Sequence, residues 1–185
     1  MFGAILAILY LHAREIIERL GDGSLDICFS GFDLLRESEI NTQNKINLIK
    51  KLNFGKANLV VAIPDPWIDV QTIADLEEIA FEFRDKKKKR LRVATKYPNL
   101  TRDFLFSKGV TQFKLVDSLG ATEAYPFTGS AELITDITST GETLRANNLR
   151  ILKDGEILKS QACIFTSKKN SKKKGLKNLI RLLSN

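Results

Sequence analysis

Residues 132–144 read ELITDITSTGETL, an apolar segment that ends in Asp136 and runs into a loop rich in hydroxyl side chains. Gly141 lies in this loop, and without a Cβ its backbone can turn tightly and approach a ligand closely. A helix predicted to begin directly afterwards would point its unpaired amides and positive dipole end at the same place. This order of strand, hydroxyl loop and helix start indicates an α/β protein with an anion-binding turn.

The hydroxyl loop can be interpreted in two ways. Thr138, Ser139, Thr140 and Thr143 would add neutral donors to a cradle for a phosphate monoester, and Asp136 could accept hydrogen bonds from sugar hydroxyls. Taken alone, the pattern Thr-x-Thr-Gly-x-Thr is equally typical of a plain capped helix start. Glu142 adds an acid to the loop, which is unfavourable beside phosphate unless the carboxylate points to solvent.

Outward from this loop, short apolar segments alternate with helical patterns, which favours mostly parallel sheets with ligands at the carboxyl ends of the strands. We expect strands at 25–30, 46–52, 58–63, 91–95, 113–117 and 131–137. We expect helices at 12–20, from 34, from 72 or 75 to 83, at 99–108, from 143 and at 175–183, with a helical turn at 122–126. Asp154-Gly155 predicts a hairpin between strands at 149–153 and 156–160.

The chain has 185 residues and a formal net charge of +7, which suits anionic partners such as nucleotides and polyphosphates. Much of the excess lies in Lys86–Arg90 (KKKKR) and in the lysines of residues 168–177, and solvated loops are the favoured interpretation of both. Nucleic-acid binding is disfavoured because no aromatic residues are interleaved with the lysines for stacking on bases.

The scarce residue types exclude several kinds of site. Cys28 and Cys163 are far apart in apolar surroundings, which favours buried thiols in a reducing cytoplasm over a disulfide. His12 is the single histidine, so a multi-histidine metal site is excluded and no catalytic nucleophile stands out. Residues 1–11 are nearly all apolar but too short to span a bilayer, and a buried strand is favoured over a signal-peptide core. We therefore predict no membrane association and no metal site made by the protein alone.

Residues 136–149, DITSTGETLRANNL, resemble the signature of the ATP phosphoribosyltransferase family, and residues 92–102, RVATKYPNLTR, resemble a second motif of that family. Further segments match in the same order: 23–37 (GSLDICFSGFDLLRE), 52–63 (LNFGKANLVVAI), 120–124 (GATEA) and 155–162 (GEILKSQA). The resemblance covers about residues 10–165 and is closest to the short-form catalytic subunits.

This resemblance implies an enzyme that transfers phosphoribose from phosphoribosyl pyrophosphate to N1 of ATP, at the start of histidine biosynthesis. The transfer passes through an oxocarbenium-like state, which needs positioning and charge complementarity more than a nucleophile. The implied substrate-binding residues are Asp136 for the ribose, 138–143 for the 5′-phosphate, Lys96 for the pyrophosphate or ATP phosphates, and Asp33 in the lining of a cleft. Mg²⁺ would arrive bound to phosphoribosyl pyrophosphate.

The resemblance also implies a two-lobed α/β fold like the type II periplasmic binding proteins, with mixed, mostly parallel sheets. Lobe I would comprise residues 1–64, lobe II residues 65–148, and residues 149–185 would return to lobe I and end in a basic tail. We expect no C-terminal histidine-binding domain of the kind that the long form carries. The implied partner is a regulatory subunit resembling histidyl-tRNA synthetase, in a hetero-oligomer that contains a homodimer of this chain.

The opening of the chain departs from the family pattern, because the family's first strand and its Lys-Gly-Arg loop have no counterpart in residues 1–11. An alternative is therefore a catalytically impaired homologue that binds a phosphoribosyl ligand or the regulatory subunit. A periplasmic solute receptor is a third interpretation, and it would require an export signal.

Overall fold

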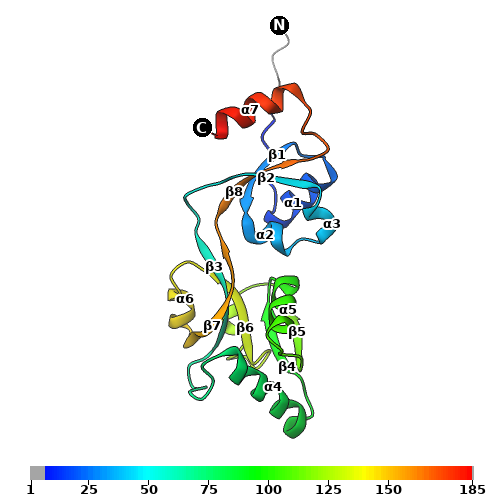
Figure 1. Cartoon of the computed structure of the whole chain (residues 1–185). Coiled ribbons are helices and arrows are strands. Elements are labelled where there is room, and N and C mark those ends of the chain that lie inside the picture. The colour runs from blue at the N-terminus through cyan, green and yellow to red at the C-terminus, as the bar shows by residue number, and fades with distance from the viewer. Residues whose placement is uncertain (1–6, 185) are drawn as a thin grey trace. The chain divides into compact units, whose positions relative to one another are not determined.

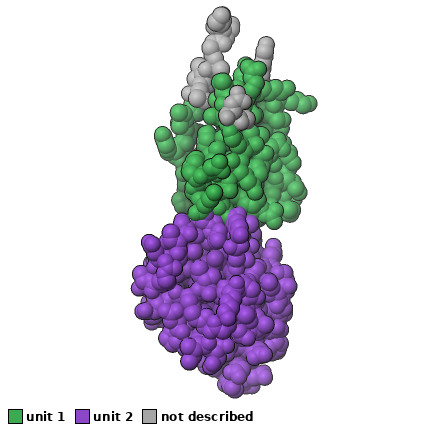
Figure 2. All heavy atoms as spheres, turned by 60° about the vertical axis from the view of Figure 1, so that its left-hand side comes forward, with its two compact units in different colours: residues 1–56, 160–185 green, residues 57–159 purple. Residues whose placement is uncertain are grey.

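The computed structural model describes residues 7–184, which form two compact units (Figures 1 and 2). One unit is the continuous segment 57–159, and the other combines residues 7–56 with 160–184. The boundaries differ from the predicted 1–64, 65–148 and 149–185, because the segments 57–64 and 149–159 belong to the second unit. Both segments form strands of its sheet, so their pairing assigns them there.

The first unit contains a three-stranded sheet in the order β1-β8-β2, and both of its strand pairs are antiparallel. Its core joins helix and sheet side chains, including Ile17, Leu20, Cys28, Cys163 and Phe165. Its elements are α1 (Ala13–Asp22), β1 (Ile27–Gly31), α2 (Phe32–Glu37), α3 (Ile40–Gln43), β2 (Ile46–Lys51), β8 (Ala162–Ser167) and α7 (Lys174–Ser184).

The second unit contains a five-stranded sheet in the order β5-β4-β6-β3-β7. Its strands are β3 (Ala57–Pro64), β4 (Leu91–Thr95), β5 (Phe113–Asp117), β6 (Leu133–Thr138) and β7 (Leu149–Ser160). Its helices are α4 (Ile73–Lys87), α5 (Pro98–Ser107), the 3₁₀ turn η1 (Thr122–Ala124) and α6 (Glu142–Ala146). β5, β4 and β6 are parallel, whereas β3 runs antiparallel to β6. The predicted mixed α/β fold is confirmed, and β4 pairs in parallel with both β5 and β6.

Both faces of the five-stranded sheet are buried, which explains the nearly continuous apolar run of β3. Val61 and Ile63 pack on one side with residues of α4 and α5. Val60 and Ala62 pack on the other side with Leu144 of α6. α4 begins as the sequence predicts, because Thr72 and Asp75 form a reciprocal capping box.

Two predictions about local structure are wrong. Asp154-Gly155 forms no hairpin, since β7 continues through it unbroken. A Cβ on the buried Gly155 would lie 3.1 Å from the Val61 carbonyl oxygen, so the glycine lets β7 approach β3 closely. Residues 7–11 form no strand, and Ile8, Leu9 and Tyr10 are exposed. Residues 1–6 of that predicted strand lie outside the described part. Across residues 7–184, no helix has the length and apolar character needed to cross a bilayer.

Candidate active site

The hydroxyl loop lies between β6 and α6, at the carboxyl end of the three parallel strands of the second unit. Thr138 is the last residue of β6, and its Oγ1 accepts a hydrogen bond of 2.9 Å from the Gly141 amide. Gly141 has a φ of 74°, in the left-handed region that favours glycine. The Glu142 amide donates to Thr140 Oγ1 at 3.3 Å. The loop is therefore a tight turn held by its own hydroxyls.

The side chains of this loop are accessible to a ligand. Ser139, Thr140, Glu142 and Thr143 are exposed and Thr138 is partly exposed. The exposed position of Glu142 is the one that a carboxylate next to a phosphate site requires. Because α6 is only five residues long, an anion at this loop would depend more on the loop amides and hydroxyls than on a helix dipole.

Asp136, two residues before the end of β6, is the acid nearest the loop in sequence. Burial raises the pKa of the Asp136 carboxyl, while a hydrogen bond from the Ile137 amide and the nearby charge of Lys96 lower it in part. Glu123 of η1 raises the same pKa further, so it also lies within electrostatic reach of Asp136. The structure thus brings together Asp136, Lys96 and Glu123 from the ends of three segments.

Three buried threonine hydroxyls hold the ends of β4 and β6 together beneath this group. Thr95, Thr101 and Thr135 form a ring in which the Oγ1–Oγ1 distances are 3.1, 2.7 and 2.6 Å. The Tyr97 amide also donates to Thr95 Oγ1, at 2.8 Å. Thr95 precedes Lys96 and Thr135 precedes Asp136 in the chain, so this hydroxyl ring fixes the backbone that carries both charged groups.

Asp33 is the one predicted site residue that lies in the other unit. Only 6% of it is exposed, and Ser160 Oγ donates to its Oδ1 at 2.5 Å. The Asp33 amide in turn donates to Ser160 Oγ at 3.0 Å. Asp33 therefore ties α2 to the start of the returning segment, and its predicted contact with substrate remains a prediction.

Two features of the site were missed from the sequence. Glu123 lies in the motif at 120–124, where the sequence indicates no role for it, and its position near Asp136 depends on the turn after β5. The hydroxyl ring joins residues 34 and 40 positions apart, and its threonines read simply as strand and helix residues. Only the position of Thr95 and Thr135 at the ends of neighbouring strands could have indicated that they meet.

Comparison with known proteins gives consistent results. The family model for ATP phosphoribosyltransferase matches residues 12–185. An ATP phosphoribosyltransferase of Nitrobacter winogradskyi is 48% identical over 176 residues, covering 95% of this chain and 54% of that protein. One from Brucella melitensis is 48% identical over 166 residues, covering 89% of this chain and 72% of that protein. The chain therefore spans about half to three quarters of these relatives.

Solved structures agree on the fold. The ATP phosphoribosyl transferase (HisG:HisZ) complex from Thermotoga maritima matches with a TM-score of 0.72 and 26% identity, over 94% of this chain and 75% of that one. An ancestral amino-acid-binding protein, AncCDT-1, matches with a TM-score of 0.57 and 15% identity over 93% of this chain and 66% of that one, which supports the binding-protein-like fold alone. On the family model and the sequence identities, the chain belongs to the ATP phosphoribosyltransferase family.

Proposed function

We propose that the chain transfers phosphoribose from phosphoribosyl pyrophosphate to N1 of ATP and releases pyrophosphate, the first step of histidine biosynthesis. Family membership supports this activity. The main structural support is that an accessible hydroxyl loop, Asp136 and Lys96 lie at the same edge of the sheet. That edge is where open α/β sheets bind their ligands.

Each group would have a separate task. The amides and hydroxyls of 138–143 would hold the 5′-phosphate of phosphoribosyl pyrophosphate, which anchors the sugar. Asp136 would accept hydrogen bonds from the ribose hydroxyls, and these donors would offset the cost of burying its carboxylate. Lys96 would face the pyrophosphate or the ATP phosphates and balance the negative charge that develops as pyrophosphate departs.

Magnesium fits this arrangement as a companion of the substrate. Among the described residues, no three His, Cys, Asp or Glu side chains are grouped so that they could hold a metal ion. Mg²⁺ commonly keeps several waters and binds phosphate oxygens with only one or two carboxylates, and Asp136 and Glu123 are carboxylates at this edge. Bound there with pyrophosphate, it would neutralise charge on the leaving group.

The proposed surroundings follow from the same relationship. One solved relative is a HisG:HisZ complex, which supports a regulatory subunit as partner of this chain. We expect that subunit to resemble histidyl-tRNA synthetase and the assembly to contain a homodimer of this chain. Cys28 and Cys163 are both buried free thiols, and burial raises the pKa of Cys28 to about 12, which fits a reducing cytoplasm.

The direct test is product formation from ATP and phosphoribosyl pyrophosphate, with and without the regulatory subunit. Thr140→Val should weaken phosphoribosyl pyrophosphate binding by about tenfold, since it removes a hydroxyl from the loop at nearly constant volume. Thr111→Val, at an exposed threonine outside the site, is the matched control. Calorimetry showing unchanged affinity for Thr140→Val would remove the loop from the site.

Binding of phosphoribosyl pyrophosphate without turnover would identify the alternative, a homologue that only holds ligand or partner.

Thr140→Val is a cleaner test than Gly141→Val. At a φ of 74°, valine would strain the turn, and its Cβ would lie 3.0 Å from Arg145 Nη1. A loss of binding in Gly141→Val could then come from a distorted loop.

A further inference from the structure

A pocket lies at the end of the parallel strands opposite to the hydroxyl loop. Its volume is about 360 Å³, and its lining includes Trp67, Phe83, Lys87, Lys89 and Arg90. Arg92, near the start of β4, and Glu132, just before β6, also line it. Because strands rise about 3.3 Å per residue, the five residues of β4 separate this pocket from the hydroxyl loop by about 15 Å. Its volume falls within the range of roughly 300–1,000 Å³ that small-molecule sites occupy.

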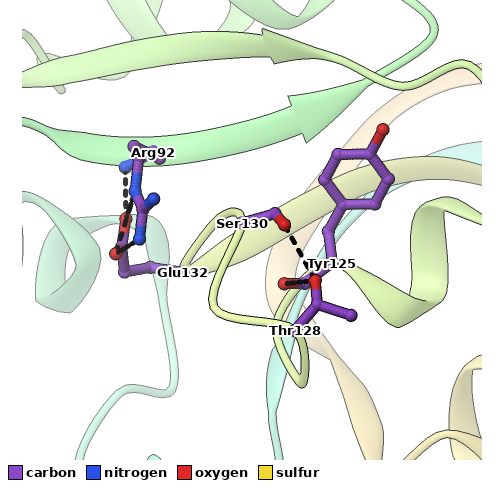
Figure 3. Close-up of polar contacts among 5 residues, drawn as sticks. All are labelled: Arg92, Tyr125, Thr128, Ser130 and Glu132. Atoms are coloured by element: carbon purple, nitrogen blue, oxygen red, sulfur yellow. Dashed lines mark hydrogen bonds and ion pairs between the residues drawn. The ribbon is translucent and has the colours of Figure 1, made fainter.

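The two charged groups at the strand starts neutralise one another (Figure 3). Arg92 Nη2 lies 2.6 Å from Glu132 Oε1, and the Arg92 amide donates to Glu132 Oε2 at 2.7 Å. The hydrogen bonds that Arg92 donates to the Glu132 carboxylate raise the pKa of its guanidinium. The Glu132 carboxylate, whose side chain is 17% exposed, is thus paired and presents little repulsion to an incoming anion.

The walls of the pocket are held by hydrogen bonds before any ligand enters. In the turn 125–131, Thr128 Oγ1 donates to the Tyr125 carbonyl at 3.1 Å and contacts Ser130 Oγ at 2.9 Å (Figure 3). The Ser130 amide donates to the same carbonyl at 3.1 Å. On the Trp67 side, Arg150 of β7 donates to the Trp67 carbonyl and, at 2.6 Å, to that of Val70. A preformed wall lowers the entropic cost of binding.

Three further cations that line the pocket, Lys87, Lys89 and Arg90, are not paired with carboxylates in the described part of the chain. Within residues 7–184, no ion pair joins Lys87, Lys89 or Arg90 to an acid, whereas Lys86 pairs with Glu82 at 3.2 Å. Lys87 Nζ lies 3.7 Å from the centroid of the Phe83 ring. No aromatic residues are interleaved with the lysines of Lys86–Arg90 in the sequence. In the folded chain, however, Trp67 and Phe83 line the same pocket as three of these cations.

We propose that this pocket binds a nucleoside diphosphate, with the base against Trp67 and the two phosphates on Lys87, Lys89 and Arg90. Three cations match the roughly three negative charges of a diphosphate near neutral pH. Any nucleobase can stack on an aromatic ring, because every base has a π-face. Arg and Lys are the usual partners of phosphate. The pocket is separate from the proposed active site because the two lie at opposite ends of β4 and β6.

Trp67 is the single tryptophan of the chain, so its fluorescence reports on this pocket. The probe is GDP, because the proposed active site takes an adenine nucleotide. We expect GDP to quench Trp67 with saturation below about 1 mM. Lys89→Glu combined with Arg90→Glu should weaken this binding at least about tenfold. The matched control is Lys114→Glu with Lys177→Glu, two exposed lysines outside the pocket, and it should retain the affinity within about twofold.

Four outcomes would overturn the proposal. One is a linear, unsaturated quench, and another is equal weakening in the two charge-reversal variants, which would indicate a general effect of net charge. The third is loss of the signal in Thr140→Val, which would assign it to the hydroxyl loop. Inorganic pyrophosphate, tested on Thr140→Val, should bind at least about tenfold more weakly than GDP. Equal binding would show that the ring contributes nothing and would also overturn the proposal.

Discussion

Asp136 carries a cost to folding that its proposed ligand would relieve. Burial is the largest influence on its carboxyl and raises its pKa above the ordinary value of 3.8. An acid with a raised pKa in the folded state binds protons more tightly there than in the unfolded chain. The free energy of unfolding of the protein therefore falls as pH rises through the pKa that Asp136 has in the folded state. Ribose hydroxyls donating to the carboxylate would favour its ionised form and so reduce this cost.

Asp136→Asn should therefore raise the Tm by a few degrees at pH 7 while weakening phosphoribosyl pyrophosphate binding at least about tenfold. The difference in Tm between variant and wild type should shrink as pH falls below 3.8, where the carboxyl becomes protonated in the unfolded chain as well as in the folded state. Thermal unfolding at several pH values and calorimetry of ligand binding measure the two effects. A variant that is less stable than the wild type at pH 7 would contradict this account of the carboxylate.

At the scale of elements, the hydroxyl ring joins β4, α5 and β6 directly below the proposed active site. Thr101→Val keeps the side-chain volume but removes the α5 member, which leaves two buried hydroxyls with fewer partners. We expect a loss of about 1–3 kcal/mol in the free energy of unfolding, measured with urea. Thr101→Ser restores the hydroxyl and should recover part of this loss. If the two variants are equally stable, the ring has no role in the fold.

The same ring should affect substrate binding through position alone. Because Thr95 and Thr135 precede Lys96 and Asp136, Thr101→Val should raise the KM for phosphoribosyl pyrophosphate more than it lowers kcat. Thr101→Ser should return KM towards the wild-type value. A change confined to kcat would show that the ring does not position the binding groups.

The elements that the sequence predicted well are those whose pattern is local. LRVAT and FKLVD form β4 and β5 with the expected bounds, because β-branched and apolar residues lie between turn signals. The hairpin predicted at Asp154-Gly155 is wrong because this dipeptide occurs both in hairpin turns and where two strands approach closely. Only the position of the neighbouring strand β3 distinguishes the two cases. The motif alone suggests Asp136, Lys96 and the hydroxyl loop as site residues, and this assignment stays a prediction, whereas Glu123 and the pocket at Trp67 depend on contacts between distant segments.

At the scale of the whole molecule, the two units have separate cores. The clusters around Leu76 and around Ile134 contain only residues from 57–159, and the cluster around Phe165 contains none of them. The second unit is also continuous in sequence, and it starts in β3 and ends in β7, which are neighbours in its sheet. These features are those of a domain that can fold alone.

We expect a fragment of residues 57–159 to unfold cooperatively in urea and to show the same Trp67 emission as the whole chain, because the residues that line the pocket at Trp67 all lie in this fragment. Unfolding followed by circular dichroism and by Trp67 emission should give coincident transitions. The flanking segments, 1–56 and 160–185, should fold only when both are present. A fragment 57–159 without a cooperative transition would show that its core depends on the other unit.

The central position of β8 sets an order of events during protein synthesis. β8 pairs with both β1 and β2, yet it follows them by more than a hundred residues of chain. Since domains fold as they leave the ribosome, the inserted unit can be complete while β1 and β2 still wait for the strand between them. Their exposed edges would then be most open to chaperones, or to aggregation, until residues 162–167 emerge.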